Sequence, residues 1–425
     1  MKQKLKLALV GAGERGQYCY APYAKMHGYE IEFVAVADPH KGRREKVVQD
    51  YHVPAEGVFE TAEQFFARPR MADAVLICTQ DSQHYAYACQ AIDLGYSILL
   101  EKPISPSVRE CLDLQRRAEE KGTQIMVCHV MRYTKFYRKL KELIDSGVIG
   151  DVVHVTHTEN VAYWHQVHSF VRGNWRREDE TSPMILAKSC HDMDILLWMV
   201  GSHCTKVSSF GSLGHFRPEN APDGAPARCL DGCPAADTCP YDAERIYLRD
   251  KGVHVPVIRK VVSLENTDES VREALKTGPY GRCVYRCDND VVDHQVASLL
   301  FENGTTVAFT MCAFSDACDR TVKFMGTRGE IRASMDNNVI EVTQFGAGVR
   351  TGTTAVYTVK PGSTGHSGGD EGIMEEFVSI LKGERENTNT IAQSVHSHVM
   401  AFAAEESRLT GRTVDVADFE KSVMA

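Results

Sequence analysis

Three glycines near the N-terminus have the spacing of a phosphate-binding turn. Gly11, Gly13 and Gly16 follow an apolar run that ends at Val10, in the stretch ALVGAGERG. The first glycine permits a tight turn out of a strand, the second lets the backbone approach a pyrophosphate, and the third lets the next helix pack closely. The spacing therefore predicts a dinucleotide site, although an ordinary glycine-rich turn has the same pattern.

An acidic residue stands where such a site needs one. Asp38 ends the apolar, β-branched stretch IEFVAVAD (31–38), about twenty residues beyond the glycines. A carboxylate there can accept hydrogen bonds from both adenosine ribose hydroxyls, which favours NAD over NADP. Asp38 could instead cap a helix, and the basic residues Lys41, Arg43 and Arg44 leave NADP open as the cofactor.

The elements that must position these residues alternate between strands and helices. A helix is expected over 15–27, and further buried strands over 72–80, 96–103 and 123–133. This alternation predicts a doubly wound parallel sheet, whose ligands lie beyond the carboxyl ends of the strands. Four polar side chains fall at those ends: Asp38, Thr79, Lys102 and His129.

The second half of the chain has a different pattern. Alternating stretches at 151–160, 295–314 and 331–345, with turn signals at Asn303-Gly304 and Asn337-Asn338, predict a large, open and mostly antiparallel sheet. We therefore expect an α/β protein with a Rossmann domain over 1–130 and a substrate-binding and oligomerisation domain over 131–425. Helices near the C-terminus should pack back onto the first domain.

Composition excludes several classes of function. The chain has 425 residues, 43% apolar residues and a net charge of −9, which argues against nucleic acid or an anionic membrane as the main partner. No apolar run approaches the roughly 18–20 residues that span a bilayer. We expect a cytoplasmic enzyme, in which a disulfide framework would be unusual.

A cysteine-rich insertion spans about 214–290. Cys229, Cys233 and Cys239 are closely spaced in a loop rich in Pro and Gly, and His215 is a candidate fourth ligand, with Cys204, Cys283 and Cys287 as alternatives. In a reducing compartment such thiols favour a metal over disulfides. A structural zinc would hold together an insertion too polar to be stabilised by burial; free thiols are the alternative.

Taken together, these residues resemble the Gfo/Idh/MocA oxidoreductase family. The resemblance rests on VGAGERG, CTQDSQH (78–84), EKP (101–103), HVMRY and SCHDMD. It implies a Rossmann domain, a C-terminal α/β domain and hydride transfer between a nicotinamide and a sugar-like alcohol, in homo-oligomers. The residues expected at the cofactor are Gly11, Gly13, Glu14, Arg15, Gly16, Asp38, Thr79, His84, Glu101, Lys102 and His129.

The same resemblance assigns catalytic roles. Lys102 is similar to the EKP lysine that touches substrate and cofactor, and His191 matches the histidine of the family pattern D-x-G-x-H-x-x-D. The chain departs from that pattern, because Ala187 and Ser189 replace the aspartate and the glycine, and Lys188 is new. Lys188 shares a helix face with His191 and could bind or deprotonate substrate, or be a solvated surface lysine.

Further polar and aromatic side chains could recognise a carbohydrate substrate, or could be ordinary loop residues. They are Tyr133, Trp164, His165, Asn174, Arg176, Asp194, Asp293 and His294. The expected function is NAD-dependent oxidation of a secondary hydroxyl of a sugar, inositol or glycoside. The alternatives are a glycosidase that keeps NAD bound and works by oxidation, elimination and reduction, and a non-catalytic sensor of NAD or sugar.

Overall fold

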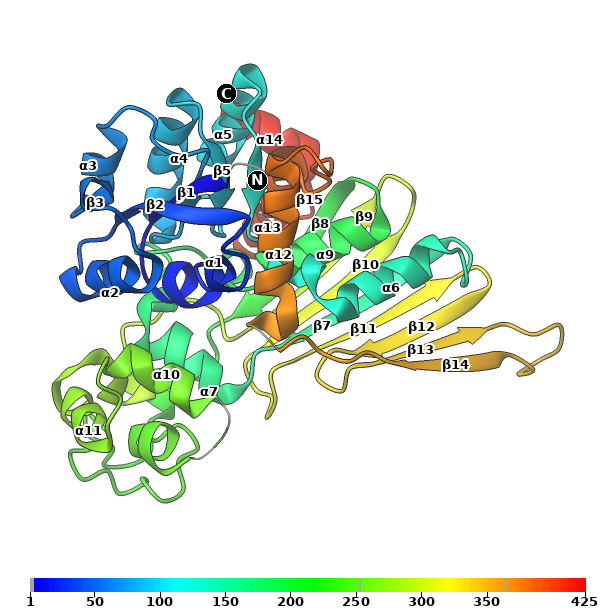
Figure 1. Cartoon of the computed structure of the whole chain (residues 1–425). Coiled ribbons are helices and arrows are strands. Elements are labelled where there is room, and N and C mark those ends of the chain that lie inside the picture. Colours follow the sequence, from blue (N-terminus) through cyan, green and yellow to red (C-terminus); the bar gives the residue numbers. More distant parts are fainter. Residues whose placement is uncertain (1–3, 251, 253, 364) are drawn as a thin grey trace.

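The structure is a computed structural model that describes residues 4–250, 252, 254–363 and 365–425. Two sheets organise the chain, and Figure 1 shows the N-terminal one in blue and cyan, apart from the larger sheet in yellow. The α/β class and both sheets were predicted correctly.

The first sheet is parallel and has six strands in the order β3-β2-β1-β4-β5-β6. The strands are β1 (Leu5–Val10), β2 (Ile31–Ala37), β3 (Val58–Phe59), β4 (Ala74–Ile77), β5 (Ser97–Leu100) and β6 (Ile125–Val127). Val10 pairs with Ala37 on one side and Ile77 on the other, so the ends of three strands meet at one edge. The strands are almost wholly buried, as expected of a sheet covered on both faces.

Helices of the N-terminal half connect these strands. They are η1 (Glu14–Tyr20), α1 (Tyr23–Met26), α2 (Lys41–Tyr51), α3 (Ala62–Phe66), α4 (His84–Asp93) and α5 (Val108–Lys121). The continuous helix expected over 15–27 is wrong. Pro22 interrupts it because proline lacks the N–H that a continued helix requires.

The second sheet has nine strands in the order β14-β13-β12-β11-β7-β10-β9-β8-β15. Its strands are β7 (Val152–Asn160), β8 (Cys204–Ser212), β9 (His294–Phe301), β10 (Thr306–Cys312), β11 (Asp319–Gly326), β12 (Gly329–Ser334), β13 (Val339–Gln344), β14 (Thr353–Thr358) and β15 (Val414–Asp415). β10 runs parallel to β7, and the other pairs are antiparallel. Alternate residues of β9 are buried and exposed, so one face of the sheet is covered.

The remaining helices connect the two sheets. They are α6 (Lys135–Asp145), α7 (Tyr163–Gln166), α8 (Met184–Ala187), α9 (Cys190–Val200), α12 (Gly369–Leu381), α13 (Ile391–Thr410) and α14 (Val416–Met424). α13 packs against α5, α9 and β8, and α12 packs against η1. The C-terminal helices thus lie against the N-terminal layer, as expected (Figure 1).

The insertion has a hydrophobic core of its own. It contains α10 (Val255–Val262) and α11 (Asp268–Thr277), drawn in green in Figure 1. Phe216, Tyr247 and Tyr280 are buried in a cluster with Val271 and Leu275. The expectation that this segment is too polar to be stabilised by burial is therefore wrong, because its aromatic residues supply the missing apolar area.

Among the described residues, no helix combines the length and the apolar composition needed to cross a membrane.

Candidate functional site

The glycine turn has the geometry that its spacing predicts. Gly11 has φ +92, and a Cβ there would lie 2.4 Å from the Cys78 carbonyl oxygen. A Cβ at Gly16 would lie 2.2 Å from the Gly11 carbonyl oxygen, so η1 can begin this close to β1 only with glycine. A Cβ at Gly13 would meet no atom within 4 Å, which leaves space where a diphosphate could approach the backbone.

Asp38 lies at the carboxyl end of β2, next to this turn. Its two carboxylate oxygens accept hydrogen bonds from the backbone N–H groups of Ala12 and His40, both at 2.8 Å. Arg44 is turned inward, where it donates to the Asp38 carbonyl oxygen, whereas Lys41 and Arg43 are exposed. A ribose here would meet Asp38 first, and the exposed cations lie farther along α2.

His84 connects two strand ends. Its Nδ1 lies 2.7 Å from the Pro103 carbonyl oxygen and its Nε2 lies 3.1 Å from the Thr79 carbonyl oxygen. The Lys102–Pro103 peptide bond is cis. The Thr79 hydroxyl is buried and has no hydrogen-bond partner among the described residues. The residues present therefore fit a dinucleotide: an open approach at Gly13, a carboxylate for ribose and an unpartnered hydroxyl.

A buried ionic network connects the glycine turn to α12. Arg15 Nε lies 2.6 Å from Glu101 Oε1, and Arg15 Nη2 lies 2.8 Å from Asp370 Oδ1. Tyr20 donates to the same Glu101 oxygen at 2.5 Å, whereas Glu14 is exposed. Burial would raise the pKa of Glu101, but Arg15 outweighs it and lowers that pKa. Glu101 thus holds Arg15 beside the cofactor turn.

Lys102 and His191 come from different halves of the chain and meet at this edge. Lys102 Nζ donates to the Ala187 carbonyl oxygen at 2.9 Å, just before α9 begins. Burial, reinforced by the positive charge of Lys102, lowers the pKa of His191 well below its usual value, so its imidazole is neutral. His191 Nδ1 is buried without a hydrogen-bond partner among the described residues.

Lys188 faces the large sheet. Its Nζ lies 3.2 Å from Glu159 Oε1, and Arg320 lies 2.7 Å from the other Glu159 oxygen. Arg320 also pairs with Asp192 at 2.8 Å. Burial raises the pKa of Glu159 despite both cations. Lys188 is therefore a partly buried, paired lysine and not a solvated surface residue.

His129 and Asp194 lie behind the site. His129 Nδ1 is 2.8 Å from Asp194 Oδ1, and Arg132 binds both Asp194 oxygens, its Nε at 2.6 Å. His129 and Asp194 are 0% exposed. Both residues connect the end of β6 to α9, and neither presents a free polar atom to a ligand except the unpartnered His129 Nε2.

Four other candidates, Tyr133, Trp164, His165 and Asn174, lie in different parts of the fold. Tyr133 is buried in the core below α12. Trp164 stacks on His254, with ring centroids 3.9 Å apart, and on His165. Burial, with Lys188 nearby, lowers the pKa of His165 well below its usual value. Asn174 is exposed.

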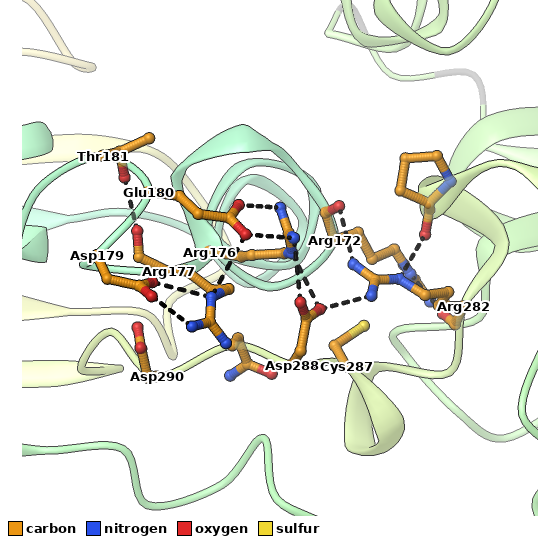
Figure 2. A network of polar contacts seen from close by, with 12 residues as sticks. Arg172, Arg176, Arg177, Asp179, Glu180, Thr181, Arg282, Cys287, Asp288 and Asp290 are labelled. Atoms are coloured by element: carbon orange, nitrogen blue, oxygen red, sulfur yellow. Dashed lines mark hydrogen bonds and ion pairs between the residues drawn. The ribbon is translucent and has the colours of Figure 1, made fainter. Parts of the chain in front are cut away.

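Arg176 is engaged in the ionic network drawn in Figure 2. Its guanidinium pairs with Glu180 and with Asp288, which also binds Arg282. These arginines lower the pKa of Asp288. The network joins the loop after α7 to the end of the insertion, so Arg176 has a structural partner on each side.

His294 begins β9, and Asp293 directly precedes it. The buried Asp293 accepts hydrogen bonds from the backbone N–H groups of Gly214 and His215, at 2.9 and 2.7 Å, and its other oxygen lies 2.7 Å from His294 Nδ1. Asp293 thereby fixes the start of the insertion, and its carboxylate is fully used.

The predicted metal ligands are not assembled. Among the described residues, no group of three His, Cys, Asp or Glu side chains is placed to hold a metal ion. Cys229, Cys233 and Cys239 are free thiols, and His215 Nε2 lies 3.1 Å from the Tyr285 hydroxyl. The cysteines pack on the aromatic core of the insertion instead, and Cys229 receives a hydrogen bond from the buried Arg172 at 3.4 Å.

Three residues of this site were not predicted from the sequence. His366, in the turn before α12, and Asp370, in the first turn of α12, reach the Arg15 network, and His398 of α13 accepts a hydrogen bond from the Ile104 N–H at 3.0 Å. They lie far along the chain in helices that appear merely amphipathic. Acidic and imidazole groups within four residues, as in HSGGD (366–370), were the available signal.

A Rossmann sheet with this turn, together with a second open sheet and the helix α9 that carries His191, is typical of an NAD-binding oxidoreductase. The sequence profile of the Gfo/Idh/MocA NAD-binding Rossmann domain matches residues 5–129, and that of the C-terminal α/β domain matches residues 141–416. The chain belongs to the Gfo/Idh/MocA oxidoreductase family, as its motifs indicated, and is an NAD(P)-dependent oxidoreductase.

Three relatives are similar to this chain at low sequence identity. YteT of Bacillus subtilis (strain 168) is 25% identical over 367 residues, which cover 82% of this chain and 82% of YteT. The scyllo-inositol 2-dehydrogenase (NAD(+)) of the same organism is 27% identical over 219 residues, or 50% of this chain and 59% of that enzyme. The 2,7-anhydro-N-acetylneuraminate hydratase of Mediterraneibacter gnavus is 27% identical over 48% of this chain and 51% of its own length.

Solved structures share the fold over nearly the whole chain. An NAD binding oxidoreductase from Klebsiella pneumoniae superposes with a TM-score of 0.72 at 15% identity, over 97% of this chain and 99% of that one. An oxidoreductase from Agrobacterium radiobacter, in complex with NAD+, L-tartaric acid and magnesium, gives 0.70 at 17% identity, over 98% and 100%. At these identities the similarity concerns the fold alone.

Proposed function

We propose that this protein oxidises a secondary hydroxyl of an inositol, sugar or glycoside with NAD as hydride acceptor. The observation that carries the proposal is the meeting of Lys102, at the end of β5, with the segment that leads into His191: Lys102 Nζ is 2.9 Å from the Ala187 carbonyl oxygen. Residues 1–130 would hold the cofactor and 131–425 the substrate.

The chemistry needs a proton acceptor next to a hydride acceptor. When bound, NAD accepts the hydride from the carbinol carbon. The neutral His191 imidazole would take the hydroxyl proton, and the cationic Lys102, which donates to the Ala187 carbonyl oxygen, would stabilise the negative charge that develops on the substrate oxygen. Asp38, free of a facing arginine because Arg44 is turned inward, favours NAD over NADP. Weak similarity to an inositol dehydrogenase supports the substrate class.

The test is a screen of inositols, free sugars and glycosides with NAD+ and NADP+ in separate reactions, followed by absorbance of the reduced nicotinamide. We expect reduction of NAD+ with at least one polyol or sugar, and weaker reduction of NADP+. If no compound reduces either cofactor while the protein binds NADH, the proposal fails and a sensor role replaces it.

A second candidate function is glycoside cleavage by oxidation, elimination and reduction with NAD kept bound. The observation that favours it is the Lys188–Glu159 pair, 3.2 Å apart, which adds a basic group where the family pattern has none. Elimination needs a second base, because oxidation acidifies the neighbouring C–H. Release of an aglycone without net NADH would support this candidate, and stoichiometric NADH would exclude it.

We also propose that copies of the chain associate through the open face of the large sheet. Phe210 of β8 and Val296 and Leu300 of β9 are exposed, although apolar. Such a surface is typical of protein interfaces. Light scattering of the purified protein should give a mass above the 47.3 kDa of one chain, and a monomer at micromolar concentration would contradict this.

A further inference from the structure

A histidine that the family pattern does not supply stands at the opening of the site. His366 precedes α12, and its ring centroid lies 6.3 Å from that of His191. The two rings differ in access to water, because the His366 side chain is 41% exposed whereas His191 is 7% exposed. His366 therefore lies between the buried imidazole and solvent.

A buried carboxylate orients this histidine. His366 Nδ1 lies 3.0 and 3.1 Å from the two oxygens of Asp370, whose side chain is 1% exposed. Burial would raise the pKa of Asp370, but the hydrogen bond from His366 and the charge of Arg15 lower it, so the carboxylate is ionised. An ionised Asp370 accepts a hydrogen bond from the Nδ1–H group of His366. The other ring nitrogen, Nε2, is then left free to exchange a proton.

The backbone holds the ring in this position. His366 and Ser367 have φ +49 and +54, a left-handed backbone conformation that residues other than glycine seldom adopt. Gly368 follows with φ +92. Two hydrogen bonds close the turn, from the Gly368 N–H to the Gly365 carbonyl oxygen and from the Gly362 N–H to the Ser367 carbonyl oxygen. Unfavourable dihedrals at a site opening persist only where the surroundings impose them.

The charged and titratable groups that face His366 come from three elements. Arg15 of η1 places Nη1 3.3 Å from His366 Nδ1, Asp370 belongs to α12, and His191 belongs to α9. Arg15 also pairs with Asp370 at 2.8 Å. Because Asp370 neutralises Arg15, the guanidinium does not prevent His366 from accepting a proton at Nε2.

We propose that His366, oriented by Asp370, carries the substrate proton from the buried site to solvent. The inference rests on the dehydrogenase function proposed above. The alcohol O–H bond breaks as the carbonyl forms, the hydride with its electron pair leaves to the nicotinamide, and the proton passes by way of His191 to His366 Nε2. The resulting imidazolium keeps its Nδ1–H on Asp370 and gives the Nε2 proton to water.

The buried groups alone cannot complete this transfer. Burial, Lys102 and the other neighbouring cationic groups lower the pKa of His191, so an imidazolium formed there is unfavourable and its proton needs an acceptor. His366 is a catalytic residue in this account, whereas Asp370 is a positioning residue.

The test compares H366N and H366A with wild type and with H154Q, a control whose partly exposed histidine lies on β7 and bonds to Thr306 of β10. Asparagine can donate to Asp370 in place of Nδ1, but it cannot carry a proton. We expect both His366 variants to lower kcat by about 10²-fold, with unchanged NADH affinity by fluorescence titration. The solvent deuterium isotope effect on kcat should increase, and free imidazole should partly restore H366A.

The outcomes separate the two proposals. If wild type shows no turnover with any polyol, sugar or glycoside, the proposed function fails and this inference fails with it. If wild type turns over and H366N equals it in kcat and in isotope effect, His366 only supports the turn and this inference alone is overturned. Loss of activity that imidazole does not restore, with weakened NADH binding, would equally assign a structural role.

Discussion

Two arginines, one partly buried and one fully buried, bind different kinds of partner. Arg15 is paired with the carboxylates of Glu101 and Asp370 and is 27% exposed. Arg172, in the helical segment η5 (Val167–Arg172), is 0% exposed and donates to the carbonyl oxygens of Arg282 and Tyr241. No carboxylate among the described residues lies within ion-pair distance of Arg172. One region concentrates opposite charges at a cofactor edge, whereas the other uses a cation to join loops.

This difference indicates that the surroundings of Arg15, and not those of Arg172, can support a reaction. Around Arg15, side chains from η1, β5 and α12 converge, and free groups such as His191 and His366 remain next to them. Around Arg172, the guanidinium Nε and Nη2 donate to carbonyl oxygens and to Cys229 beside an aromatic core. The predictions below test this contrast, from the largest expected effect to the smallest.

Two buried histidines provide the sharpest test. H191N should lower kcat by about 10²-fold or more, because it removes a proton acceptor at the reacting hydroxyl. H168N removes a histidine of η5 whose Nδ1 lies 2.9 Å from the hydroxyl of Tyr247 in the insertion, so it should leave kcat unchanged and lower the free energy of unfolding by about 1 kcal/mol. Steady-state kinetics measure kcat and urea unfolding measures the free energy of unfolding. An equal loss of kcat in the two variants would contradict the assignment of the reaction to the region around His191.

The two arginines give the second test. R15M should weaken NADH binding by about tenfold, because Glu101 and Asp370 lose the cation that orders the glycine turn. R172M should leave NADH binding unchanged and lower the free energy of unfolding by about 2 kcal/mol, because two buried carbonyl oxygens lose their donor. Fluorescence titration and urea unfolding distinguish the variants; the opposite assignment would refute the account.

Stability should depend on pH through His398. Burial lowers the pKa of His398 to about 3, where α13 holds the loop after Pro103. An unfolded histidine has a pKa of about 6.5. Between these values the unfolded chain binds a proton that the folded chain does not, so the free energy of unfolding falls as the pH drops from about 6.5 toward 3.

Replacing this histidine checks the sign. H398Q should show a shallower dependence of the free energy of unfolding on pH across that window than wild type, measured by urea unfolding at several pH values. H154Q, at a partly exposed position, should keep the wild-type slope. Parallel slopes for H398Q and wild type would mean that His398 is not held neutral.

The smallest effect is expected from metal removal. Because the cysteines of the insertion pack on an aromatic core and do not converge, treatment with a zinc chelator should leave Tm unchanged. Metal analysis should find zinc and iron well below one equivalent. One equivalent of zinc, together with a lower Tm after chelation, would contradict this account of the insertion and support a metal centre there.

The same contrast explains what the sequence could predict. Gly11, Gly16 and Asp38 were recognisable because their roles depend on the backbone and on spacing within one βαβ unit. Lys102 and His191 were recognisable through short motifs. The contact of Lys102 with the Ala187 carbonyl, just before the helix that carries His191, depends on how α8 and α9 pack against the Rossmann domain, which local pattern does not encode.

The insertion shows the converse. Cys229, Cys233 and Cys239 have metal-like spacing, but spacing does not say where the thiols point. The aromatic residues that stabilise the segment are scattered from 216 to 285, and only their tertiary packing makes them a core. His366 was missed for the same reason, since its partner Arg15 lies 351 residues away.

The most direct test of the central claim follows the hydride itself. A substrate found in the screen is prepared with deuterium on its carbinol carbon, and wild type and K102A are each incubated with NAD+ and that substrate. We predict that wild type yields one deuterium per reduced nicotinamide, measured by mass spectrometry, and that K102A binds NADH but transfers deuterium at least about 10²-fold more slowly. Reduced nicotinamide without deuterium, or K102A as fast as wild type, would contradict hydride transfer at the edge where Lys102 meets α9.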